Sequence, residues 1–368
     1  MKIVLNKSKL RTIAQNTALL LGSSLLVFFL IEIGYRTLDP FPYFSEDEIN
    51  VTQHGNLSQY DDELGWKGVP NGEAEFTTVN NSIWLAHNSE GYRDIEHKSE
   101  NENKPSIVFL GDSFTWGYEV EFDEMFVNLI RNKLPSYEIY NLSHRGYGTD
   151  QQLLTFMRWY EDQPVELVVL MISDNDAEEN GVSERYGKSK PYYQIVKKEL
   201  ELMGVPVPES EEWTKPSVEE AAPTSWKTTL NDFFLRSHFI HDINLRINLL
   251  MSSSKSSSVQ HHYKPKEILI TSRILEELKK EVESNGAELM VFFIPSKQEV
   301  EKLDNSPPYQ VEIIELCQEL DIEYYDLASD FQSTWPRAYY RYGTHWNVRG
   351  HEIASDAIYQ YLAEKLIP

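Results

Sequence analysis

The chain has 368 residues, 41% of them hydrophobic, which is enough apolar material to bury a full folded core. Its formal net charge of −24, from 58 acidic against 34 basic residues, argues against nucleic-acid binding, because that affinity comes largely from basic side chains that neutralise phosphates. The single cysteine, Cys317, excludes an internal disulfide, and we expect it to be a buried apolar residue in a helix over 311–320.

The N-terminal segment carries the signature of a membrane span. Residues 12–31 hold no charge and are rich in Leu, Val, Phe and Ile, and their number matches the roughly 20 residues that cross a bilayer as a helix. Basic residues precede this run and acidic residues follow it, so the positive-inside rule leaves 1–11 in the cytoplasm. We expect an uncleaved single-pass anchor over 12–35 in the inner (cytoplasmic) membrane, with the remainder facing the periplasm or exterior. A cleaved signal peptide is the alternative, although no small-x-small cleavage site follows the apolar run.

A linker with accessory strands is expected over 36–100, because this stretch is polar and rich in turn residues. From residue 101 onwards, short apolar runs alternate with segments of helical periodicity. Such alternation predicts an α/β domain over 101–368, with a central parallel sheet of about five strands between two layers of helices. The predicted strands are Ile107–Leu110, Ile139–Leu142, Leu167–Ile172, Leu289–Ile294 and Ile322–Tyr325.

The regular pattern lapses between about 180 and 264, which we interpret as an insertion. Residues 192–202 read as a β-hairpin, and the nearly all-serine stretch 252–258 reads as a flexible linker. Residues 225–251 have helical spacing, which favours a core-packing or lid helix over a helix that lies on the membrane surface.

Three candidate site residues each follow the end of a predicted strand. Ser113 comes after the first strand, Gly146 after the second and Asn175 after the third. Because ligands of open parallel sheets bind beyond the carboxyl ends of the strands, we expect this fold to bring the three together.

Four sequence blocks, taken in order, resemble the SGNH (GDSL-type) hydrolase superfamily. They are Gly111-Asp112-Ser113, the segment 141–148, the segment 173–176, and Thr344-His345-Trp346-Asn347 with the residues up to His351. The segments 62–66, 87–93 and 148–151 are similar to those of membrane-anchored bacterial members. The resemblance covers roughly 60–178 and 287–366, and it implies the three-layer fold of that superfamily and a serine esterase activity.

The resemblance also implies roles for individual residues. Ser113 is the nucleophile, and His345 is the base that takes its proton and returns it to the leaving alcohol. The oxyanion hole consists of the backbone amides of Ser113 and Gly146 and the side-chain amide of Asn175. Gly148 competes with Gly146 for this role, but Gly146 fits the family spacing better. The block around Asn175 departs from the pattern because Ser173 stands where a glycine is usual.

A larger departure concerns the third member of a catalytic triad. The family pattern places an aspartate two or three residues before the histidine, where this chain has Gly343 and Tyr342. Its loss predicts a Ser–His dyad, with the imidazole held by a backbone carbonyl near Tyr342 or by a carboxylate from elsewhere such as Asp326. Loss of catalysis is the remaining alternative. His351 is expected to be a packing or capping residue.

The expected activity is hydrolysis of O-acetyl or other short-chain acyl esters through an acyl-serine intermediate at the cell envelope, on a substrate such as acetylated polysaccharide. One alternative is an O-acyltransferase that modifies exported or cell-surface polysaccharide. Another is a catalytically silent carbohydrate-binding or assembly protein with the same fold. We expect no cofactor and no metal, because the acidic residues over 174–179 lack the spacing of a calcium loop.

Overall fold

The structure is a computed structural model that describes residues 7–38, 52–97, 104–160, 164–210, 262–301, 308–332 and 337–366, together with positions 237, 239, 240, 243 and 247. The chain divides into two compact units. The first comprises residues 1–49 and 221–255, and the second comprises 50–220 and 256–368.

The first unit is built on the helix α1 (Lys7–Leu38). Its segment Lys9–Thr37 is long and apolar enough to cross a membrane, and such a helix near an N-terminus fits either an anchor or a signal sequence. Within this unit, the Ser237 hydroxyl donates a hydrogen bond of 2.8 Å to the Glu32 carboxylate of α1. Most of the predicted helical stretch 225–251, and all of the serine run 252–258, lie outside the described residues.

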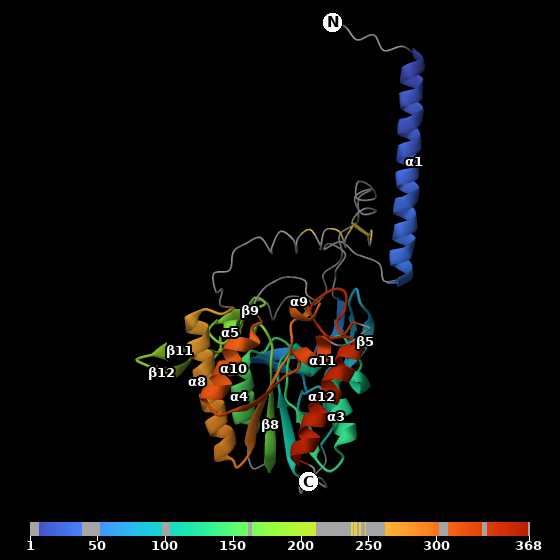
Figure 1. Ribbon diagram of the computed structural model, residues 1–368. Coiled ribbons are helices and arrows are strands. Elements are labelled where there is room, and N and C mark those ends of the chain that lie inside the picture. The colour runs from blue at the N-terminus through green and yellow to red at the C-terminus, as the bar shows by residue number, and fades with distance from the viewer. Residues whose placement is uncertain are drawn as a thin grey trace. The chain divides into compact units, whose positions relative to one another are not determined.

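The second unit contains a five-stranded parallel sheet, as predicted (Figure 1). The central strands are largely apolar because helices cover both faces of the sheet, so most of their side chains are buried on either side, whereas the edge strand Glu323–Asp326 is only partly buried. The five apolar runs in the sequence therefore coincide with the strands to within two residues. In sheet order the strands are β14 (Glu323–Asp326), β13 (Glu288–Phe293), β8 (Val165–Ile172), β6 (Ser106–Leu110) and β7 (Glu138–Asn141).

Two apolar layers sandwich the sheet (Figure 1). On one face lie α4 (Thr149–Trp159), α8 (Pro265–Ser284) and α10 (Gln310–Glu319). On the other lie α3 (Phe126–Lys133), α11 (Ala328–Gln332) and α12 (Val348–Leu366). Cys317 is buried in α10, as expected, and burial raises the pKa of its thiol to about 12, which makes it a packing residue.

Short antiparallel strands accompany the main sheet. They are β1 (Thr52–Gly55), β4 (Glu73–Thr77) and β5 (Ser82–Ala86) in one sheet, and the hairpins β2 (Ser58–Asp61) with β3 (Gly65–Gly68), β9 (Glu184–Arg185) with β10 (Lys188–Ser189), and β11 (Tyr192–Val196) with β12 (Glu199–Met203). The last hairpin is the one predicted over 192–202. A separate apolar cluster joins β4 and β5 to Trp116 of the short helix α2 (Ser113–Trp116). Other helices in the described part of the chain are η3 (Phe122–Glu124), α5 (Asp176–Glu179) and α9 (Lys297–Val300).

Candidate active site

Ser113 stands at the carboxyl end of β6, where the chain turns sharply into α2. The carboxylate of Asp112 caps this helix by accepting a hydrogen bond of 2.9 Å from the backbone N–H of Phe114. Gly111 is required in the turn, since a Cβ there would lie 2.1 Å from the Thr115 hydroxyl oxygen. The turn therefore presents Ser113 at the edge of the sheet where ligands of such folds bind.

His345 reaches Ser113 from the loop that precedes α12. Its Nε2 lies 2.7 Å from the Ser113 hydroxyl oxygen, within hydrogen-bond distance. The rings of Tyr118 and Phe114 pack against the imidazole, with centroid separations of 4.3 and 5.0 Å. Burial lowers the pKa of His345 to about 4, because the charged imidazolium is poorly solvated there. The imidazole is consequently neutral near pH 7 and able to accept the serine proton.

Two backbone amides near Ser113 are available to a ligand. Among the residues that the structure describes, neither the N–H of Ser113 nor that of Gly146 finds a hydrogen-bond acceptor. Gly146 has a left-handed backbone conformation, with φ of +74°, which favours glycine. A Cβ at this position would lie 2.8 Å from the ring of Tyr186, so side chains crowd the backbone here. Gly148 serves a different purpose, since it precedes α4 and packs closely against Glu179.

Asn175 supplies a third donor. Its Oδ1 accepts a hydrogen bond of 2.9 Å from the Ser173 hydroxyl, which leaves the Nδ2 group as the free end of the amide. The structure thus gathers Ser113, His345, Gly146 and Asn175 around the carboxyl ends of β6, β7 and β8, the arrangement expected from the sequence. Such an arrangement can bind an oxygen that gains negative charge beside an attacking hydroxyl group.

Two buried carboxyl groups lie behind this donor set, and their connection was not foreseen. The Ser173 hydroxyl oxygen lies 2.8 Å from Asp112 Oδ2 and 2.9 Å from Asp176 Oδ2. Burial raises the pKa of Asp112 to about 6; burial together with repulsion from Asp112 raises that of Asp176 to about 8. The pair therefore holds a proton near pH 7. Ser173, a departure from the family pattern, joins the two acids to Asn175.

Among the residues that the structure describes, no carboxylate contacts the imidazole of His345. Within the described residues, Nδ1 of His345 has no hydrogen-bond partner. Asp326, considered as the orienting acid, lies at the end of the edge strand β14 and instead accepts a hydrogen bond of 2.9 Å from the Ala328 backbone. Position in the sheet explains this result, because β13 and β8 separate β14 from β6, the strand that carries Ser113.

The loop before His345 is held by a buried lysine. Lys297, the first residue of α9, donates hydrogen bonds to the backbone carbonyls of Tyr340, Arg341 and Gly343, at 2.6, 2.7 and 3.1 Å. The Asn80 side chain adds a bond of 3.0 Å to the Tyr342 carbonyl. These contacts fix the backbone where the family pattern has its aspartate. Sequence reasoning missed Lys297, because nothing in the spacing of α9 points to a distant loop. His351 accepts a hydrogen bond of 3.2 Å from the Phe126 backbone, in keeping with its expected packing role.

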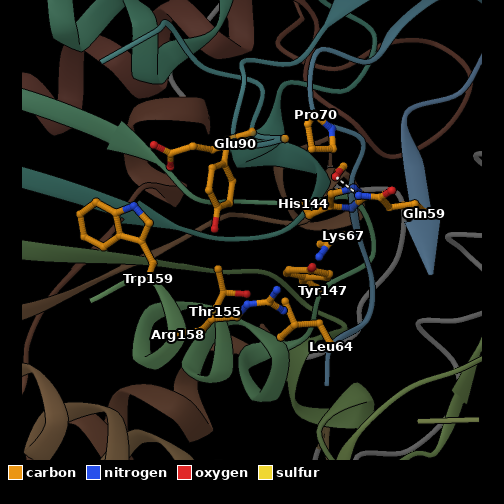
Figure 2. Close-up of a pocket in the computed structure, with 13 residues that line it drawn as sticks. Gln59, Leu64, Lys67, Pro70, Glu90, His144, Tyr147, Thr155, Arg158 and Trp159 are labelled. Atoms are coloured by element: carbon orange, nitrogen blue, oxygen red, sulfur yellow. Dashed lines mark hydrogen bonds between the residues drawn. The ribbon is translucent and has the colours of Figure 1, made fainter. Parts of the chain in front are cut away.

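A cleft of about 420 Å³ is lined by residues that include neither Ser113 nor His345. Figure 2 shows Trp159, Tyr147 and Arg158 among its walls. Burial would raise the pKa of the neighbouring Asp61, but hydrogen bonds from Lys67 and Arg158 and from the backbone lower it to about 2. The charged side chains of Lys67 and Arg158 in this cleft therefore form ion pairs with Asp61.

Comparison with known proteins gives one family and several distant structures. The model of the GDSL-like lipase/acylhydrolase family matches residues 109–353, more than half of the chain. The lipase/acylhydrolase from Enterococcus faecalis is 13% identical, with 72% of this chain and 98% of that chain covered and a TM-score of 0.40. The SGNH hydrolase from Slackia heliotrinireducens, whose function is unproven, is 11% identical, with 71% of this chain and 100% of that chain covered and a TM-score of 0.38. The psychrotrophic esterase EstA from Pseudoalteromonas sp. is 10% identical, with 72% of this chain and 100% of that chain covered and a TM-score of 0.38. No curated protein matches the chain.

Proposed function

The chain belongs to the GDSL-like lipase/acylhydrolase family and is an ester-bond hydrolase, and we propose that it acts through an acyl-serine intermediate on Ser113. The observation that carries this proposal is the 2.7 Å separation of the Ser113 hydroxyl oxygen and His345 Nε2. A serine hydroxyl is a weak nucleophile at neutral pH and needs an adjacent base. His345, neutral because burial lowers its pKa to about 4, is that base.

The reaction proceeds in two halves. In the first, Ser113 Oγ attacks the ester carbonyl carbon while its proton passes to His345 Nε2, and the carbonyl oxygen becomes an oxyanion. The amides of Ser113, Gly146 and Asn175 stabilise that charge. The carbon–oxygen bond to the alcohol then breaks, and the alcohol takes the proton from His345. In the second half, water attacks the acyl-serine, His345 again relays the proton, and the carboxylic acid leaves.

The base works as part of a dyad. In a triad, a carboxylate orients the imidazole and stabilises its charged form. Here the rings of Tyr118 and Phe114 and the loop held by Lys297 orient His345, with no carboxylate at Nδ1 among the described residues. These contacts supply orientation without negative charge, so the imidazolium formed during attack is stabilised less than in a triad.

Short-chain acyl esters, O-acetyl groups among them, are the substrates that we propose, at the outer side of the cytoplasmic membrane. The apolar helix Lys9–Thr37 supports an anchor there, and the basic residues before it support a cytoplasmic N-terminus. Acetylated polysaccharide at the envelope is one such substrate.

The test uses the full-length protein in detergent, with 4-nitrophenyl acetate and acetylated polysaccharide as substrates. Ser113→Ala should remove ester hydrolysis, whereas Ser284→Ala, a control at the exposed end of α8, should leave it unchanged. Free acetate is the expected product. Undiminished hydrolysis by Ser113→Ala would refute the nucleophile, and acetylated acceptor sugar in place of free acetate would show acyl transfer.

A further inference from the structure

Arg145 is a partly buried cation directly before the candidate oxyanion donor Gly146. Its guanidinium lies over the ring of Trp116, with 4.9 Å from Cζ to the centroid, and 5.9 Å from the centroid of Phe76. Its hydrogen bonds are long, at 3.2 Å to Gln53 Oε1 and 3.4 Å to the Ser58 hydroxyl. Within the described residues, no carboxylate forms an ion pair with it.

Within the described residues, long hydrogen bonds together with the absence of a carboxylate partner distinguish Arg145 from Arg93 and Arg131. Arg93 also lacks a carboxylate, but its two Nη groups donate hydrogen bonds to the backbone carbonyls of Trp116, Gly117 and Val120. Arg131 pairs with the carboxylate of Asp94. A charge removed from water costs free energy unless it is paired and fully hydrogen-bonded. In a chain with 58 acidic residues, the lack of a carboxylate partner for Arg145 within the described residues calls for a functional explanation.

The surroundings of Arg145 place it beside the reacting groups. The ring of Phe76, which lies near this guanidinium, packs edge-on against the ring of Tyr118, with 5.1 Å between the two centroids. Tyr118 packs on the imidazole of His345, and the Tyr186 ring lies against the backbone of Gly146. Arg145 is thus connected to the base through the rings of Phe76 and Tyr118, and it directly precedes the candidate donor Gly146 in the chain. A second guanidinium, that of Arg185, lies over the Tyr186 ring, 4.6 Å from its centroid.

We propose that Arg145 binds an anionic group of the substrate, so that the preferred substrate is an ester whose acyl or alcohol part carries a carboxylate or a sulfate. This inference rests on the proposed function, because it assumes that the ester carbonyl sits at Ser113. Aromatic rings contact the flat face of the guanidinium, and its N–H groups lie along the edge. An arginine held in this way can donate two parallel hydrogen bonds to one anion.

Two matched pairs of substrates test the proposal and locate the anion. For the acyl side, the pair is 4-nitrophenyl hydrogen adipate and 4-nitrophenyl hexanoate, each corrected for spontaneous hydrolysis. For the alcohol side, it is 4-acetoxybenzenesulfonate and 4-acetoxybenzenesulfonamide. The full-length wild type should prefer the anionic member of at least one pair by about tenfold in kcat/KM, the difference expected for a charge-assisted hydrogen bond.

Arg145→Met should abolish that preference, measured as the ratio of the kcat/KM values for the two members of a pair. The ratio cancels any loss of rate that both esters share because Arg145 no longer contacts Trp116, Gln53 and Ser58. Arg145→Lys should retain part of the preference for the anionic ester. The control is Arg158→Met, which removes an arginine paired with Asp61 in the separate cleft and should keep the full preference.

Equal rates for both members of both pairs in the wild type would overturn the proposal, and this comparison needs no variant to fold. A preference that survives in Arg145→Met would overturn it as well. Failure of the proposed function has a different signature, since Ser113→Ala would then still hydrolyse neutral and anionic esters alike.

Discussion

Ser113 and His345 lie 232 residues apart in sequence, yet the hydroxyl oxygen of one is 2.7 Å from Nε2 of the other. The contact forms because β6 ends at the same edge of the sheet as the loop before α12. We have proposed these two residues as nucleophile and base, and no carboxylate among the described residues bonds to the imidazole.

The amide of Asn175 should contribute to the chemical step more than to substrate binding. Asn175→Ala is expected to lower kcat by about 10²-fold to 10³-fold with little change in KM, because an oxyanion donor acts mainly in the transition state. Steady-state kinetics with 4-nitrophenyl acetate measures both constants. Asn285→Ala, at the C-terminal end of α8, is the matched control and should have no effect. An increase in KM of the same size, with kcat unchanged, would contradict the assigned role.

The acid limb of the pH–rate profile should fall near pH 4. Catalysis needs a neutral imidazole, and burial lowers the pKa of His345 to about 4. The log of kcat/KM should therefore be flat above about pH 5 and fall with decreasing pH below that value. Measurement between about pH 3.5 and 8 with a neutral ester checks this. A limb near the ordinary histidine pKa of about 6.5 would instead indicate an imidazole paired with a carboxylate.

Lys297 should act on catalysis through His345. Lys297→Met removes the hydrogen bonds to three carbonyls of the loop before His345 and should lower kcat by about tenfold or more, with KM little changed. In a His345→Ala background, the same substitution should cause no further fall in the residual rate, because its effect requires the imidazole.

Lys279→Met is the control for Lys297, since Lys279 also donates to a backbone carbonyl, that of Asp321, but at the surface. Additive losses in the double variant would show that Lys297 supports the fold in general and not the position of His345. Thermal unfolding of each variant separates a loss of stability from a loss of rate.

Stability should decline as the pH rises from about 4, the ordinary aspartate pKa, towards about 8 and should level off above that value. Burial raises the pKa of Asp112 to about 6 and that of Asp176 to about 8, so the folded state keeps a proton that the unfolded chain has released above about pH 4. Stability from this proton is present at low pH and is lost as the pH rises through the folded-state values. The expected slope is about −1.4 kcal/mol of unfolding free energy per pH unit for one proton.

Asp112→Asn should reduce that slope, because an amide can still accept from the Phe114 N–H and donate to Ser173 without ionising. Asp356→Asn, which alters a surface pair with Lys133, is the control. Urea unfolding at several pH values between about 6 and 9 supplies the free energies. An unchanged slope in Asp112→Asn would mean that the two carboxyl groups do not share a proton.

Much of the fold was predictable because buried parallel strands leave a simple pattern. The run 167–172 is apolar at every position, and both faces of β8 are indeed buried. The placement of Ser113 and Asn175 followed from the strand ends that precede them. His345 was found through its motif, since no periodicity connects it with a strand.

Other parts of the site depend on loop geometry that no local pattern encodes. The carbonyls of the loop 340–343 converge on Lys297 only after the chain has folded, so the lysine gave no signal. Ser173 was noted as a departure from a glycine, but its contacts with two acids require strands β6 and β8 to be adjacent. Asp326 was considered from its residue type alone, and the strand order places it elsewhere.

The most direct test of the account is covalent labelling of the full-length protein with a fluorophosphonate, followed by mass spectrometry of its peptides. A hydroxyl activated by His345 should form one phosphonyl adduct, located on Ser113 and absent from Ser113→Ala. His345→Ala should slow its formation by about 10³-fold or more. An unmodified Ser113, or labelling that is as fast without His345, would contradict the claim that these two residues form the reactive pair.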